Sequence, residues 1–60
     1  MAQKVFITGA SSGIGEALAY DYAGSGAVLG LAARRTDRLE QVAERCRELG
    51  GHPHIYTLDV

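Results

Sequence analysis

The stretch Thr8-Gly9-Ala10-Ser11-Ser12-Gly13-Ile14-Gly15 places three glycines between two segments of different hydrophobic pattern. We call residues 9–15 the glycine loop. Before it, residues 4–8 read Lys-Val-Phe-Ile-Thr, a β-branched and aromatic run that predicts a strand buried on both faces. From Ile14 onward, Leu18 and Tyr22 follow at intervals of four, which is typical of one face of a helix. The sequence therefore predicts a strand, a short loop and a helix ending at Gly24.

The rest of the chain repeats this alternation. Residues 27–33 are apolar or small and predict a second strand. Thr36 or Asp37 is then expected to cap a second helix. Its apolar positions follow helical spacing: Leu39, Val42, Ala43, Cys46 and Leu49. Gly50 and Gly51 end that helix, and residues 54–60 predict a third strand.

Strand, helix, strand, helix and strand in this order form a βαβαβ unit of the α/β class. Right-handed crossovers place its strands in a parallel sheet of order 3-2-1. Such a unit is the N-terminal part of a doubly wound, Rossmann-type sheet. With 60 residues, the chain is expected to be one incomplete portion of a single domain, residues 1–60.

Composition narrows the function classes. Hydrophobic residues make up 47% and charged residues 22% of the chain, which is typical of a globular protein. The formal net charge of -1 argues against nucleic-acid or membrane partners. No apolar run approaches the roughly 20 residues of a membrane span, and no secretory signal is evident, so a cytoplasmic location is expected.

The glycine loop lies where a phosphate-binding turn is found, between a predicted strand and a predicted helix. Gly9 permits a tight turn off the strand. Gly13 and Gly15 remove side chains either where the backbone approaches a pyrophosphate or where the helix approaches the strand. Ser11 and Ser12 add hydroxyl groups. Without Gly-Lys-Ser/Thr the loop is no Walker A motif, so a dinucleotide is expected, and ordinary turn glycines are the alternative.

The end of the second predicted strand indicates which dinucleotide. NAD-preferring proteins carry a carboxylate there, but this chain has Ala33 followed by Arg34 and Arg35, which we call the arginine pair. A guanidinium can meet the oxygens of a 2′-phosphate with two parallel hydrogen bonds. NADP is therefore favoured over NAD, and solvated loop charges are the alternative.

With these motifs, the sequence resembles the short-chain dehydrogenase/reductase family in its classical branch. Residues 8–15 match that family's Thr-Gly-x-x-x-Gly-x-Gly signature, and the resemblance covers all 60 residues. It implies an oxidoreductase that transfers a hydride between a nicotinamide and a carbonyl or alcohol. It also implies that Arg34 meets the 2′-phosphate, where Ser11 and Arg35 are expected to assist, and that Asp59 and Val60 contact the adenine. The predicted cofactor-binding residues are Gly9, Ser11, Ser12, Gly13, Ile14, Gly15, Arg34, Arg35, Asp59 and Val60.

Catalytic residues are not expected within this chain. The family uses a Tyr-x-x-x-Lys pair, but Tyr20 and Tyr22 are followed four residues later by glycines, so the resemblance places that pair after Val60. His52 and His54 lack a third ligand nearby, and no metal site is expected. The whole protein is expected to be a homo-oligomer acting on a small molecule. The alternatives are a non-catalytic NADP-binding regulatory module and a structural peptide that associates through open sheet edges.

Overall fold

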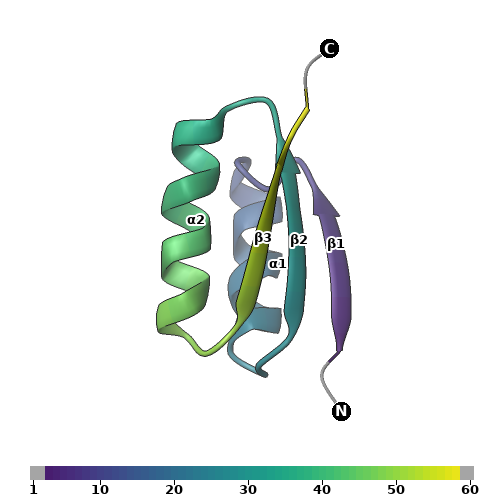
Figure 1. The fold of residues 1–60 in the computed structure, drawn as a ribbon, viewed down its shortest axis with the longest axis vertical. Helices are drawn as coiled ribbons and strands as arrows, with labels where there is room; N and C mark the ends of the chain where they lie inside the picture. Colours follow the sequence, from purple (N-terminus) through teal and green to yellow (C-terminus); the bar gives the residue numbers. More distant parts are fainter. Residues whose placement is uncertain (1–2, 59–60) are drawn as a thin grey trace.

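Three strands and two helices alternate along residues 3–58, the part of the chain that the computed structural model describes. They are β1 (Lys4–Thr8), α1 (Gly13–Ala23), β2 (Val28–Ala33), α2 (Thr36–Glu48) and β3 (His52–Thr57). The strands form one parallel sheet with β2 between β1 and β3 (Figure 1). This arrangement confirms the predicted α/β fold with strand order 3-2-1.

The strand register brings two loops to one edge of the sheet. Thr8, the last residue of β1, lies beside Ala32, and Thr57, the last residue of β3, lies beside Ala33. The β1–α1 and β2–α2 loops therefore both leave the carboxyl edge of the sheet, at the top of Figure 1. In open α/β sheets this edge is where ligands bind.

The core lies between the sheet and the two helices. The periodic positions of α2 that the sequence predicted are fully buried at Leu39, Val42, Ala43 and Cys46, and Leu49 packs partly buried against them. They meet the fully buried side chains of Leu29 and Leu31 on β2. The apolar stripe of α2 therefore faces the sheet, as its spacing indicated.

The buried face of α1 differs from the apolar series that indicated this helix. Ile14 is 81% exposed and Leu18 is 45% exposed, whereas the buried residues are Gly15, Ala19 and Ala23. These three small residues also recur every four positions. They let the helix approach the sheet closely, and larger side chains would hold it away.

Three element boundaries differ from the prediction. Helix α1 begins at Gly13, so the last three residues of the glycine loop are helical. The predicted caps Thr36 and Asp37 both lie inside α2, and the N-cap is Arg35, whose guanidinium has no acceptor with which to cap the helix amides. The Thr36 hydroxyl instead shares a 3.0 Å hydrogen bond with that of Thr57. Strand β3 begins at His52 and includes Pro53, which an edge strand tolerates.

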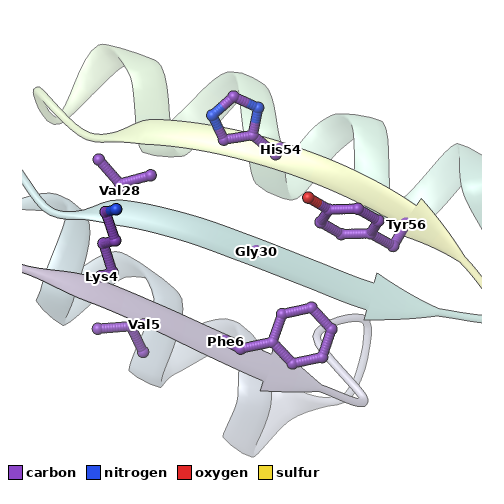
Figure 2. Close-up of a pocket in the computed structure, with 7 residues that line it drawn as sticks. All are labelled: Lys4, Val5, Phe6, Val28, Gly30, His54 and Tyr56. Atoms are coloured by element: carbon purple, nitrogen blue, oxygen red, sulfur yellow. The ribbon is translucent and has the colours of Figure 1, made fainter.

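The prediction that β1 is buried on both faces is wrong within the described residues, because both helices cover the same face. On the other face, Phe6 is 62% exposed and Tyr56 is 52% exposed. Figure 2 shows these two rings on either side of Gly30, with their centroids 5.7 Å apart. They border a shallow hollow of about 240 Å³ that also contacts Val28 and His54.

Candidate functional site at the carboxyl edge of the sheet

The glycine loop and the arginine pair are neighbours in space. The amide of Ala10 donates a hydrogen bond of 3.1 Å to the carbonyl oxygen of Ala32. This bond fastens the start of the glycine loop to the end of β2, two residues before Arg34. The two parts of the predicted site, about 20 residues apart in the sequence, thus lie on adjacent loops.

Ser12 organises the glycine loop. Its hydroxyl donates to the carbonyl oxygen of Gly9 at 2.7 Å and accepts from the amide of Gly15 at 3.3 Å. The amide of Ser12 also donates to the Gly9 carbonyl, at 2.9 Å. Ser12 is thus the N-cap of α1, a role for which serine is well suited. Ser11, the other predicted hydroxyl donor, is half-buried in the same turn.

The three glycines of the loop differ in whether the fold itself requires a glycine at their position. Gly9 has a φ of +68°, a left-handed conformation that other residues rarely adopt. Gly15 is required by packing, since a Cβ there would lie 2.4 Å from the carbonyl oxygen of Gly9. Gly13 has neither reason: its φ is not positive, and a Cβ would meet no atom of residues 3–58 within 4 Å. The open space beside Gly13 is therefore available to a ligand.

Backbone donors point into the same region. The amides of Gly13 and Ile14 donate to no acceptor within residues 3–58, and both residues are exposed at the first turn of α1. The initial amides of a helix have no partner within the helix, and the helix dipole adds positive potential there. Together these groups form a site suited to an anion such as a pyrophosphate.

The arginine pair supplies positive charge beside these amides. The Arg34 side chain is exposed and forms no hydrogen bond or ion pair with another of the described residues. Arg35 reaches the Asp37 carboxylate at 3.5 Å, but both side chains are more than 70% exposed. Such a contact is weak. Both guanidinium groups are therefore free to turn toward a phosphate.

The Asp37 carboxylate competes with a bound phosphate for the Arg35 guanidinium. The backbone amide of Arg38, and secondarily the Arg35 side chain, hold the pKa of the Asp37 carboxyl below its usual value. The group is therefore ionised at neutral pH. Ala33, where an NAD-preferring protein would carry a carboxylate, is buried.

Sequence reasoning missed a contact between the helices. The Glu16 carboxylate accepts a hydrogen bond from the Tyr20 hydroxyl at 2.8 Å and one from the Arg38 guanidinium at 2.7 Å. These bonds hold the pKa of Glu16 below its usual value, the Tyr20 bond most of all. Burial, assisted by Glu16, raises the pKa of Tyr20 to about 12. The four-residue spacing of Glu16 and Tyr20 was visible in the sequence, but the partner on α2 required the packing.

The other residues considered in the sequence analysis lie away from this edge of the sheet or outside the described residues. Asp59 and Val60, predicted to contact the adenine, lie outside residues 3–58. Cys46 is buried against the carbonyl oxygen of Ala19, and burial raises the pKa of its thiol. Between residues 3 and 58, no group of three or more metal-ligating side chains occurs, and neither helix is long and apolar enough to cross a membrane.

Comparisons of the sequence with family models and with curated proteins point to the same family. The sequence model of the family described as short chain dehydrogenase matches residues 3–60. Among curated proteins, 11-beta-hydroxysteroid dehydrogenase 1A of Arabidopsis thaliana is 65% identical over 54 residues. That match covers 90% of this chain and 15% of the relative, so the chain spans a small part of the relative's length.

Solved structures share the fold. An alcohol dehydrogenase of the archaeon Thermococcus sibiricus, complexed with 5-hydroxy-NADP, matches with a TM-score of 0.90 and 43% identity, over 98% of this chain and 26% of that one. An NAD⁺-bound xylitol dehydrogenase matches with a TM-score of 0.88 and 30% identity, over 95% of this chain and 22% of that one. The same backbone arrangement therefore occurs in proteins bound to either type of nicotinamide cofactor.

Proposed function

We propose that this chain, which belongs to the short-chain dehydrogenase family, binds the adenosine and pyrophosphate part of NADP in an oxidoreductase. NADP supplies or accepts the hydride that is exchanged with a carbonyl or alcohol substrate. Residues 1–60 contain no Tyr-x-x-x-Lys pair, so the proposed role of this chain is cofactor recognition. The homo-oligomeric state and the cytoplasmic location stay predictions.

The observation that carries the proposal is the open start of α1. Gly13 leaves space that the fold does not use, and the Gly13 and Ile14 amides have no acceptor within residues 3–58. A pyrophosphate fits both features, because it brings anionic oxygens and needs close approach to the backbone. Ser12 orders the turn, and Gly9 and Gly15 allow it to form.

The choice of NADP rests on the arginine pair. The fold occurs with NADP-type and NAD-type ligands, so we assign the choice between them to the side chains at the end of β2. Two exposed guanidinium groups follow β2, and no carboxylate stands at Ala33 to accept hydrogen bonds from a ribose 2′-hydroxyl. Charge-assisted hydrogen bonds to a 2′-phosphate therefore favour NADP. We propose Asp59 and Val60 as adenine contacts.

The test of this choice is a charge reversal at Arg34. Dissociation constants for NADP and NAD are measured on the full-length protein, meaning residues 1–60 with any sequence that accompanies them in the natural chain. Arg34→Asp is expected to weaken NADP binding by about tenfold or more, roughly 1.4 kcal/mol, and to leave NAD binding within about threefold. Arg47→Asp, the same charge reversal in the last turn of α2, is the control and should change neither. Equal losses for both cofactors at Arg34 would contradict the assignment.

An activity assay separates the enzyme from a non-catalytic NADP-binding module. The plant relative is named an 11-beta-hydroxysteroid dehydrogenase, so a hydroxysteroid and its ketone are the first substrates to test. NADPH oxidation that requires a carbonyl compound supports an oxidoreductase. Tight NADP binding without turnover on a panel of carbonyls and alcohols favours the regulatory module.

A further inference from the structure

The Glu16–Arg38 pair joins the two helices that begin beside the proposed cofactor site. Glu16 directly follows the glycine loop, in the first turn of α1, and Arg38 lies three residues after the arginine pair, in the first turn of α2. The guanidinium donates to Glu16 at 2.7 Å and to the Gln41 side chain at 3.2 Å. The Glu16 side chain is 21% exposed and that of Arg38 is 46% exposed.

Glu16 has a charge that does not suit its surroundings once an anion binds. A carboxylate in the first turn of a helix interacts well with the helix dipole. The same carboxylate repels a pyrophosphate bound to the amides of Gly13 and Ile14, which lie three and two residues before it. The repulsion acts over a short distance, and because Gly13 and Ile14 are exposed it is sensitive to screening by salt.

Among residues 3–58, Arg38 is the only cation in contact with Glu16. Tyr20 donates a neutral hydrogen bond to one carboxylate oxygen, and Arg38 brings a full positive charge to the other. Both terminal nitrogens of Arg38 are engaged, one with Glu16 and one with Gln41. Arg38 is therefore a poor candidate for a direct phosphate contact, in contrast to Arg34, which forms no hydrogen bond or ion pair with another described residue, and Arg35, whose side chain is 75% exposed.

We propose that Arg38 is a positioning residue for cofactor binding, which acts by neutralising Glu16 and so removing its repulsion of the pyrophosphate. The proposal rests on the proposed function, because it assumes that the pyrophosphate lies at the start of α1. Since the pyrophosphate is common to NADP and NAD, Arg38 affects both cofactors equally. Arg34, by contrast, affects only the 2′-phosphate.

The test is a double-mutant cycle on the full-length protein, with dissociation constants for NADP and NAD measured at low and high salt. Arg38→Ala is expected to weaken both cofactors by about three- to tenfold, and 0.5 M salt should reduce this loss to less than about twofold. Glu16→Gln, which removes the repelling charge, should keep affinity within twofold of the wild type. The double variant should recover most of the loss caused by Arg38→Ala.

This pattern differs from that of a purely structural link. If the ion pair only holds the helices together, Glu16→Gln and Arg38→Ala should weaken binding alike, and the double variant should not recover. Arg38→Lys, which keeps the charge, should bind close to the wild type. Arg38→Gln, which removes the charge but keeps a hydrogen-bonding side chain, replaces Arg38→Ala as the test if the latter does not fold. Arg45→Ala is the matched control, since Arg45 pairs with Glu48 at the far end of the same helix.

Three further results would overturn the proposal. Unchanged affinity in Arg38→Ala, with or without a lower melting temperature, contradicts it while leaving the proposed function intact. A loss confined to NADP would make Arg38 a 2′-phosphate contact instead. A wild-type protein that binds neither cofactor overturns the proposed function and this inference with it.

Discussion

Alanine at Gly13 and at Gly15 should separate binding from folding. The two positions lie in the same turn of α1, and the substitution adds the same methyl group at each. At Gly13 the methyl enters open space, with no atom of the described part of the chain within 4 Å. Alanine is also the better helix former, by up to about 1 kcal/mol. Gly13→Ala should therefore leave the free energy of unfolding unchanged or raise it slightly.

The same methyl at Gly13 occupies space that we assign to the pyrophosphate. We expect NADP to bind Gly13→Ala at least about tenfold more weakly, which corresponds to roughly 1.4 kcal/mol. At Gly15 the added Cβ would lie 2.4 Å from the Gly9 carbonyl oxygen, against an ordinary contact of 3.4 Å or more. Backbone must move by about 1 Å, so Gly15→Ala should destabilise the fold by about 1–3 kcal/mol.

The assay combines two readouts on the full-length protein. Urea unfolding followed by circular dichroism gives the free energy of unfolding, and NADPH fluorescence gives the dissociation constant. The expected pattern is a stable Gly13→Ala variant that binds poorly and a Gly15→Ala variant that is destabilised. If Gly13→Ala is stable and binds NADP as tightly as the wild type, the cofactor does not approach the start of α1, and the reasoning is refuted.

Two further predictions concern pH and self-association. The pKa of the Tyr20 hydroxyl is raised from 10.0 to about 12 in the folded protein. As pH rises from 10, the hydroxyl therefore loses its proton in the unfolded chain before it does so in the folded one. The free energy of unfolding should then fall by up to about 1.4 kcal/mol per pH unit between pH 10 and 12, and urea titrations of Tyr20→Phe should lack this part of the slope. The isolated 60-residue chain should self-associate or fold poorly, because Phe6 and Tyr56 lie exposed on the uncovered sheet face. A monomeric peak in sedimentation velocity together with a cooperative thermal transition would contradict this.

The order of the elements could be predicted from the sequence because each boundary carries a local signal. Glycines follow β1, α1 and α2, and the two faces of α2 differ enough in hydrophobicity to identify the buried one. The two faces of α1 do not differ in this way. Gly15, Ala19 and Ala23 contribute little hydrophobicity, and they are buried because only small residues fit between α1 and the sheet.

The sequence indicated where the candidate site lies, but not which structural role each glycine has or which contacts join the two helices. The sequence left two reasons open for Gly13 and Gly15, and the distances of a virtual Cβ assign packing to Gly15 and open space to Gly13. The Glu16–Arg38 pair was not predictable, because its partners are 22 residues apart and meet only when both helices pack on the same face. Local patterns do not encode such contacts.

A crystal structure of the full-length protein with NADP tests the central claim most directly. We expect a pyrophosphate oxygen within about 3.2 Å of the Gly13 or Ile14 amide nitrogen, and the 2′-phosphate in contact with Arg34 or Arg35. A pyrophosphate bound away from the start of α1, or a 2′-phosphate that neither guanidinium reaches, would contradict it.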